Sequence, residues 1–223
     1  MSRLLNCFGR IETEVDTSGY SLLDTLVAGE YQVEMGPGIY RIVLIGGGGG
    51  GGKMRWAAGH EAFYRYAQGG VGATLDFYFE LTQATTATVT VGSGGHSDSR
   101  GDADTTATGG TDSSITGIPG LVVSCGAGTA GNIVSRTPTA GTMGTAVLTG
   151  ATIIRVDMNS NEHPIVSTTT SGIRANINWP TQSILGRGGG CSAGQGVYIY
   201  EGGAAYCYIQ YFNKNYFHPE DIL

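Results

Sequence analysis

Aromatic and histidine side chains gather in one short stretch of the chain, residues 53–68. Flat aromatic faces stack on sugars, and Tyr and Trp are favoured at protein-binding surfaces. The stretch therefore predicts a platform that binds a sugar or a protein. Packing against a sheet or at an oligomer interface is the alternative. The residues of this cluster are Trp56, His60, Phe63, Tyr64 and Tyr66.

The chain offers no constellation typical of catalysis. Serine is abundant, but the G-x-S-x-G nucleophile motif does not occur, and the 4 histidines are dispersed along the sequence. Asp76, Glu80 and Glu201 are strand candidates, and acids on strands more often face solvent than form the paired carboxylates of a glycosidase. We therefore expect no enzyme activity, with a glycan-degrading enzyme as an alternative.

Three acids, Asp98, Asp102 and Asp104, lie close enough in one polar loop to supply oxygen ligands to calcium. The loop lacks the EF-hand pattern, so we expect solvated acids and no metal site. The loop also contains Arg100-Gly101-Asp102, an adhesion tripeptide, which we attribute to chance. The 4 cysteines show no C-x-x-C spacing and predict buried free thiols, with a Cys191–Cys207 pairing left open.

The seven-glycine run at residues 46–52 also satisfies two nucleotide-binding patterns, but any run of glycine does so. The phosphate-binding loop needs Ser or Thr after its lysine, whereas Met54 follows Lys53 here. The dinucleotide motif needs a helix directly after the glycines and a βαβ unit, which the sequence does not predict. We therefore expect no nucleotide and no other cofactor.

Composition points to a folded protein that is rich in backbone surface. The 223 residues include 39 glycines, without the three-residue period of collagen, and only 13% are charged. The few charges favour an oligomer or an assembly component. The net charge of −6, without any basic stripe, argues against nucleic acid and anionic membranes as partners, and no apolar run is long enough to insert into a bilayer.

Runs of β-branched and aromatic residues between the glycines predict an all-β fold. Strands are expected at 39–45, 73–81, 87–91, 114–118, 121–125 and 197–212, with a bulge or turn at Gly202-Gly203. Residues 53–68 are expected as a short helix or an extended loop, and residues 22–27 as short strands or a small helix. The short spacing of turn signals favours a β-sandwich or a jelly-roll-like domain with polyglycine loops.

Four stretches occur in a familiar order: GIYRIVLIGGGGGGG, QGGVGATLDFYFELTQATTATVTVGSGG, GLVVSCGAGTAG and GRGGGCSAGQGVYIYEGG. This order resembles the glycine-rich domain of phage tail fibres and of some bacterial surface proteins, over about residues 36–130 and 184–212. The middle stretch is the most specific part. The first 35 residues and residues 132–180 have no counterpart in that pattern.

The resemblance implies a β-rich domain, often trimeric, whose glycine runs pack as extended polyglycine helices. Glycine lacks a side chain, so neighbouring backbones can touch, but ordering it costs entropy and needs a rigid scaffold. The glycines expected to pack in this way are Gly46, Gly47, Gly48, Gly49, Gly50, Gly51, Gly52, Gly188, Gly189 and Gly190.

Together these features predict a structural or adhesive virion protein, such as a tail fibre or receptor-binding module. The alternatives are a baseplate, connector or capsid-surface (head-fibre) protein without host contact, and a tailspike-type glycan-degrading enzyme. Expected partners are further copies in a homotrimer, other virion proteins, and a host-surface glycan or outer-membrane protein. Residues 1–35 are expected as an attachment segment, 36–212 as the β domain with an insertion at 132–180, and 213–223 as a tail. The N-terminus does not resemble a signal peptide, in keeping with a virion location.

Overall fold

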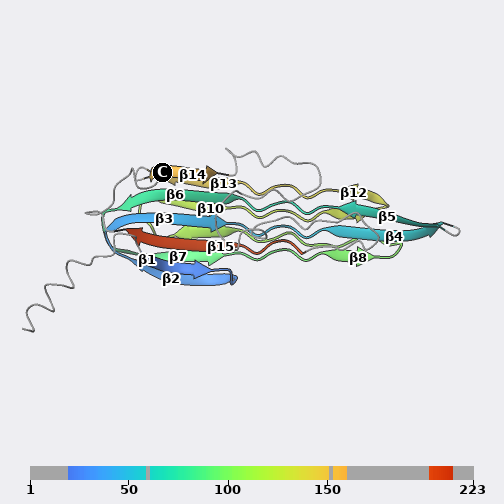
Figure 1. Cartoon of the computed structure of the whole chain (residues 1–223), viewed down its shortest axis with the longest axis horizontal. Helices are drawn as coiled ribbons and strands as arrows, with labels where there is room; N and C mark the ends of the chain where they lie inside the picture. Colours follow the sequence, from blue (N-terminus) through green and yellow to red (C-terminus); the bar gives the residue numbers. More distant parts are fainter. Residues whose placement is uncertain (1–19, 59–60, 151–152, 160–200, 213–223) are drawn as a thin grey trace, which may run out of the picture.

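The computed structural model describes residues 20–58, 61–150, 153–159 and 201–212. These residues form strands, turns and extended segments but no helix, so no described helix could cross a membrane. The described part is elongated: two large sheets lie at one end, and short strands lie at the other, which we call the tip (Figure 1). Extended, glycine-rich segments run side by side between the two ends.

Two five-stranded antiparallel sheets make up the large end, which we call the sandwich. In spatial order, the first sheet contains β1 (Tyr20–Thr25), β15 (Tyr206–Phe212), β3 (Gly38–Ile45), β6 (Thr74–Leu81) and β14 (Ile153–Asn159). The second contains β13 (Ala146–Gly150), β10 (Leu121–Cys125), β9 (Ser113–Thr116), β7 (Thr85–Val91) and β2 (Gly29–Met35).

The two sheets pack face to face around one hydrophobic core. The alternation of apolar and polar residues along the strands explains this packing. In β7, the Ala and Val residues are buried, whereas the Thr residues between them are less buried, as expected for the period of two in a strand. Strand β3 is buried on both faces: Ile42 and Leu44 lie in the core, and Val43 belongs to a second apolar cluster on the outer face. That second cluster consists of Val43, Ile45, Tyr206 and Tyr208.

Residues 20–35 belong to the sandwich and do not stand apart from it. Strand β1 pairs with β15 at the edge of the first sheet, and β2 pairs with β7 at the edge of the second. The sandwich therefore begins before residue 36, where the sequence placed the start of the domain. The helix considered for residues 22–27 is absent, because β1 and a turn occupy this stretch.

The segments between the two ends are held together by backbone hydrogen bonds with a period of three residues. In the segment 46–51, the N–H groups of Gly46 and Gly49 donate to the carbonyls of Ala73 and Gly70, at 2.9 and 2.8 Å, so both bonds reach the same neighbour. The other residues follow the same spacing: Gly47 and Gly50 donate to Thr111 and Thr108, Gly48 donates to Gly203, and the carbonyls of Gly47 and Gly50 accept from Gly128 and Gly131.

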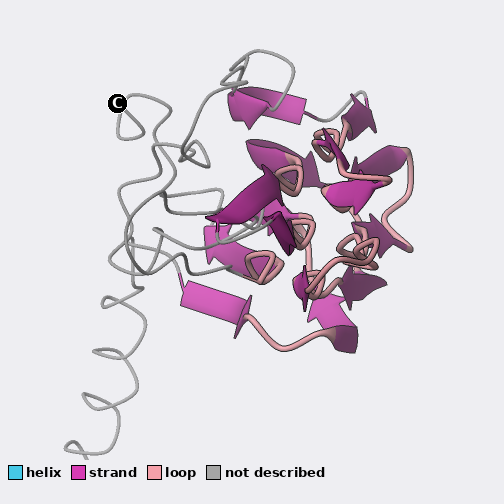
Figure 2. Ribbon diagram, turned by 90° about the vertical axis from the view of Figure 1, so that its right-hand side faces the viewer, coloured by secondary structure: helices cyan, strands magenta, loops and turns pink. Residues whose placement is uncertain are grey.

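A three-residue period with bonds in several directions is the geometry of an extended three-fold helix, which has no internal hydrogen bonds. Viewed along the long axis, the loop segments appear as small triangular coils packed against one another (Figure 2). Segment 46–51 donates to or accepts from segments 68–73, 92–98, 105–111, 126–131 and 201–205. We call this set of segments the glycine bundle.

Glycine is required in the bundle because neighbouring backbones touch where a side chain would be. A Cβ atom on Gly49 would overlap the carbonyl oxygen of Thr129, and one on Gly70 would overlap that of Thr142. Gly202, in the pair expected as a bulge or turn within a strand, donates to the carbonyl of Gly95 and joins the bundle ahead of β15. The expected packing glycines Gly188, Gly189 and Gly190 lie outside the described residues.

The tip consists of five short strands. They are β4 (Gly52–Ala58), β5 (Glu61–Ala67), β8 (Asp98–Arg100), β11 (Asn132–Val134) and β12 (Thr137–Thr139). Strands β4 and β5 form an antiparallel hairpin, β8 adds to β4 in parallel, and β11 pairs with β12. The expectation of a helix or loop at residues 53–68 is therefore wrong. The stretch alternates between two faces, and its aromatic residues favour strands.

Candidate functional site

The β4–β5 hairpin at the tip has two faces whose composition follows from its register. Lys53 lies opposite Tyr66 and Arg55 lies opposite Tyr64, and residues directly opposite one another in an antiparallel pair share a face. We call this the outer face. The inner face carries the alternate positions, including Met54 opposite Arg65.

The inner face anchors the hairpin to β11. Met54 and Ala67 are buried in a small hydrophobic cluster with Ile133, and Trp56 packs against the same cluster. This burial fixes which face of the hairpin is directed toward β11 and which is directed toward solvent. The outer face is correspondingly accessible, with Arg55 exposed and 41% of Tyr64 exposed.

Trp56 lies within cation–π distance of two arginines. The guanidinium carbons of Arg65 and Arg136 are each 5.4 Å from its ring centre. Arg136 also donates to both carboxylate oxygens of Asp102, with its Nη2 atom at 2.9 and 2.7 Å, and this hydrogen bond raises the pKa of Arg136. The indole therefore joins the hairpin to the β11–β12 turn and to the loop after β8.

The β11–β12 turn contains strained backbone. Ser135 and Arg136 have φ values of 49° and 64°, and together they form the two-residue loop between the paired residues Val134 and Thr137. Two positive φ values are typical of a type I′ turn, which favours Asn and Gly. The Asp104 carboxylate accepts the Ser135 N–H at 2.7 Å and helps to hold this conformation. Strain of this kind tends to gather at functional sites.

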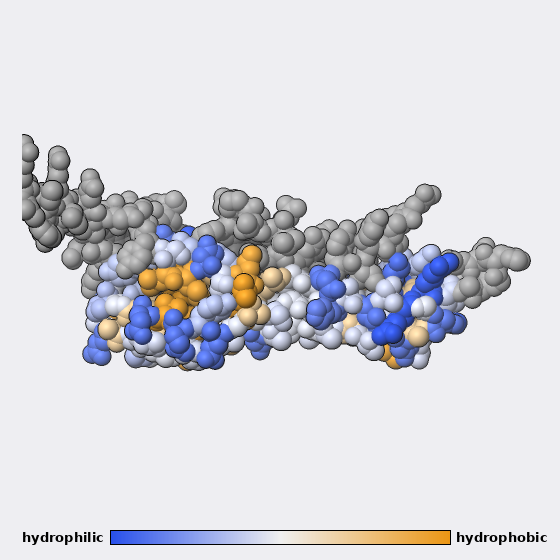
Figure 3. Space-filling model, turned by 90° about the horizontal axis from the view of Figure 1, so that it is seen from below, coloured by the Kyte–Doolittle hydropathy of each residue, from blue (hydrophilic) through white to orange (hydrophobic). Residues whose placement is uncertain are grey.

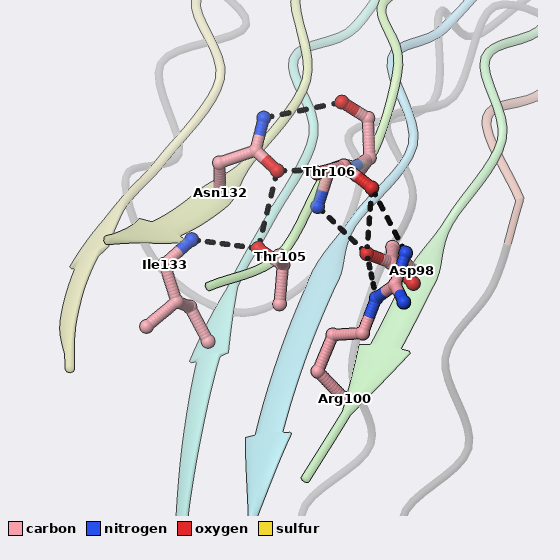
Figure 4. A network of polar contacts seen from close by, with 7 residues as sticks. Asp98, Arg100, Thr105, Thr106, Asn132 and Ile133 are labelled. Carbon is pink, nitrogen blue, oxygen red and sulfur yellow. Dashed lines mark hydrogen bonds and ion pairs between the residues drawn. The ribbon is translucent and has the colours of Figure 1, made fainter. Parts of the chain in front are cut away.

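Two polar networks join β8 and β11 to the segment 105–111, an exposed one at Asp98 and a partly buried one at Asn132 (Figure 4). The Oδ2 atom of Asp98 accepts from Arg100 at 2.8 Å and from the N–H of Thr106 at 2.7 Å. Burial raises the pKa of Asp98, but the hydrogen bonds from Arg100 and Thr106 together lower the pKa by more than burial raises it. The net shift of the pKa is therefore downward. The Oδ1 atom of Asn132 accepts from the Ala107 N–H at 2.8 Å.

The outer face combines aromatic rings with cations. The Tyr64 and Tyr66 rings are nearly parallel, with 2° between their planes and 6.4 Å between their centres. The Nζ atom of Lys53 lies 5.7 Å from the Tyr64 ring centre, and the guanidinium carbon of Arg55 lies 5.9 Å from it. The two cations therefore lie beside a ring that solvent can reach.

The aromatic cluster of the sequence is thus divided between the two faces. Tyr64 and Tyr66 lie on the outer face, whereas Trp56 packs inward. Phe63 pairs with Trp56 in register, but its side chain is not described, and His60 lies outside the described residues. The binding residues expected from the sequence did not include Lys53, Arg55, Arg65 or Arg136. The alternation of cations and rings on β4 and β5 could have indicated the first three, whereas the position of Arg136 depends on tertiary structure.

The three acids considered for calcium do not converge in the structure. Asp98 binds Arg100 and Thr106, Asp102 binds Arg136, and Asp104 accepts from a backbone N–H. No group of three or more potential metal ligands occurs among the described residues. Both charged residues of the adhesion tripeptide are engaged within the tip, Arg100 with Asp98 and Asp102 with Arg136.

The glycine run uses its backbone for packing. A phosphate-binding loop presents free N–H groups to its ligand. Here the N–H groups of Gly46 to Gly50 all donate to carbonyls of neighbouring segments. Cys125 and Cys207 are free, buried thiols in the sandwich core. Cys191, the partner considered for Cys207, lies outside the described residues.

Charge is distributed unevenly along the molecule. Of the Lys and Arg side chains that the structure describes, Arg41 alone belongs to the sandwich. The others belong to the tip: Lys53, Arg55, Arg65, Arg100 and Arg136. Seen from below, hydrophilic side chains gather at the tip, and apolar side chains gather over the sandwich (Figure 3). The tip also holds the acids Asp98, Asp102 and Asp104, of which Asp98 pairs with Arg100 and Asp102 with Arg136. The cations outside these pairs belong to the β4–β5 hairpin.

Neither the protein-family models nor the curated proteins that were compared with the sequence match it. The geometry of the tip identifies individual side chains whose role in binding can be tested.

Proposed function

We propose that this chain is an adhesive protein of a virus particle, a tail-fibre or receptor-binding module that contacts the host surface through its tip. One observation carries the proposal: the glycine bundle places an exposed hairpin of aromatic and cationic residues at the end opposite the sandwich (Figure 1). Tyr and Arg are enriched among residues that dominate binding energy at interfaces. The resemblance to glycine-rich fibre domains supplies the virion context.

The bundle suits an adhesin because it is a stiff spacer. Each segment is bonded to several neighbours along its length, so bending would break many backbone hydrogen bonds at once. A stiff spacer presents the tip in a fixed orientation, and preorganisation of this kind reduces the entropy lost on binding.

We also propose that the chain assembles into a homotrimer. The resemblance implies trimers, and the charged fraction of 13% favours extensive contact with other protein surface. Light scattering on the purified full chain gives the molar mass directly. A monomer at micromolar concentration would remove the trimer from the proposal and leave the adhesive tip to be tested on its own.

The direct test is binding of fluorescently labelled full-length protein to intact cells of candidate bacterial hosts. Tyr64→Ser alters the tip, and Val122→Ser is its matched control, because Val122 is 57% exposed at the sandwich end. We expect saturable binding that Tyr64→Ser weakens and Val122→Ser preserves, with the thermal unfolding of both variants close to that of the parent protein.

The other outcomes identify the alternatives. If no host cell is bound, the adhesive function fails, and a baseplate, connector or capsid-surface role that involves only other virion proteins takes its place. If the protein shortens a purified surface polymer, it is a glycan-degrading enzyme. Binding that Val122→Ser removes, but Tyr64→Ser does not, would place the contact at the sandwich end.

A further inference from the structure

The outer face of the hairpin contains a compact set of groups that recognise anions. Arg55 and Tyr64 lie directly opposite one another on neighbouring strands. Lys53 lies two residues before Arg55 in β4 and so belongs to the same face. Both cations approach the Tyr64 ring, at 5.7 and 5.9 Å from its centre. A cation–π contact of this kind holds the Arg55 side chain in place before a ligand arrives and leaves its guanidinium N–H groups able to donate.

The charge distribution selects the sign of the ligand. Among the described side chains of the β4–β5 hairpin, Lys53, Arg55 and Arg65 are positively charged and none is negatively charged. Two acids of the tip are paired elsewhere, Asp98 with Arg100 and Asp102 with Arg136. A local excess of positive charge attracts anions. A ligand of the outer face should therefore be negatively charged.

The aromatic geometry favours a saccharide among anionic ligands. The Tyr64 and Tyr66 rings are stacked and nearly parallel, with their centres 6.4 Å apart, so two aromatic rings lie together on the outer face. Such rings offer an apolar face for the C–H groups of a sugar ring and phenolic hydroxyls for its oxygens. A polynucleotide needs a basic groove that follows several phosphates, whereas this face carries two cations.

We propose that the outer face of the β4–β5 hairpin binds an acidic saccharide, with the sugar ring on Tyr64 and its carboxylate or phosphate on Arg55. This inference rests on the proposed adhesive function, for which it names the ligand class. Arg55 is suited to the anion because a guanidinium can pair with a carboxylate or phosphate through two parallel hydrogen bonds. Lys53 adds a second positive charge beside the same ring.

The hairpin itself supplies a matched control. Arg65 has the same charge and is also exposed, but it belongs to the inner face, where it lies over Trp56. Arg55→Gln and Arg65→Gln therefore change the net charge equally and differ only in the face they alter. A difference between them reports a specific site, because long-range attraction of an anion would fall equally in both variants.

The experiment measures binding of the full chain to polygalacturonate, with dextran as the neutral polymer, at physiological salt. We expect binding to polygalacturonate and none to dextran. Arg55→Gln should weaken binding about tenfold, as expected for loss of one charge-assisted contact. Arg65→Gln should change it less than about twofold. Tyr64→Phe should retain most of the affinity, because it keeps the ring, whereas Tyr64→Ala should lose it.

Three results would overturn the inference. The first is equal weakening by Arg55→Gln and Arg65→Gln, and the second is equally tight, Arg55-dependent binding of oligo-dT, which would make the face a general polyanion site. The third is absence of binding to polygalacturonate together with binding to host cells that Arg55→Gln leaves intact. In that case the adhesive function stands and only the ligand class fails, whereas loss of all cell binding removes both.

Discussion

The Oδ2 atom of Asp98 accepts hydrogen bonds from both the backbone N–H and the hydroxyl of Thr106, at 2.7 and 3.0 Å. Arg100 donates to the same oxygen at 2.8 Å. One carboxylate thus joins β8 to the segment that returns from the tip to the sandwich. This contact gives the tip a dependence on pH.

Asp98→Asn should destabilise the protein by about 1–2 kcal/mol at pH 7, because the amide accepts less strongly than the carboxylate. The pKa of Asp98 is lowered from 3.8 in the folded protein, so its charged form stabilises the fold above that pH. This contribution is lost as the pH falls through the lower, folded pKa. Urea unfolding at pH 7 and pH 2.5 should show the two proteins converging in acid, and Glu30→Gln, an exposed control, should show no such change.

Gly49→Ala should cost about 3 kcal/mol or more, because the new methyl group would overlap the Thr129 carbonyl and separate two bundle segments. The matched control is Gly101→Ala, since no atom lies within 4 Å of a Cβ placed there. Thermal unfolding measures both variants. Similar melting temperatures for the two would show that the bundle tolerates side chains and that close backbone packing does not explain its glycine content.

Ser135→Asn should stabilise the protein by about 0.5–1 kcal/mol, because Asn tolerates the positive φ of 49° better than Ser does. The Asp104 bond survives the change, since it uses the backbone N–H of residue 135. Ser99→Asn places the same change in β8, where no positive φ occurs, and should not stabilise. Denaturant midpoints that fall for Ser135→Asn would contradict the strain assigned to this turn.

The buried thiols should make the fold sensitive to alkali. Burial raises the pKa of Cys207 from 9.0 to about 12 and raises that of Cys125 as well. Their protonated forms therefore stabilise the folded state below pH 9, and this contribution is lost as the pH rises from 9 toward 12. In iodoacetamide at pH 8, mass spectrometry should find both thiols unmodified until urea unfolds the protein. Rapid labelling of the native protein would show that the core is open.

Most of the sandwich strands could be predicted from the sequence, because alternating or continuous apolar runs end at clear turn signals. The prediction failed at residues 53–68, where Ala57, Ala58 and the residues after them resemble a helix. The strands form there because Met54 and Ala67 bury against Ile133, which lies far away in the chain. Local propensity could not show this partner.

The site was predictable only in part, for a related reason. The aromatic cluster marks the hairpin, but the direction of each ring depends on the register between β4 and β5. Arg136 comes within 5.4 Å of the Trp56 ring centre only because the bundle returns the chain to the tip at residue 131. Bundle segments are joined chiefly by hydrogen bonds between backbone atoms. A few side chains add to them, as where the Thr108 hydroxyl accepts from the His96 N–H. Bonds between backbone atoms leave little side-chain pattern from which to predict which segments are neighbours.

The hydrogen bond from the Gly48 N–H to the Gly203 carbonyl, 2.9 Å long, joins residues that are far apart in the chain and so affects folding during synthesis. On the ribosome, the segment 46–51 emerges long before residue 203, so the Gly48 N–H has no native acceptor until residue 203 has been synthesised. Non-local pairing of this kind slows folding, because closing the long loop between the two segments costs chain entropy before the hydrogen bond forms. Until then, the unpaired N–H groups of the glycine segment can form hydrogen bonds with other nascent chains on the same polysome. A truncation before residue 203 should leave the Gly48 N–H without its native acceptor.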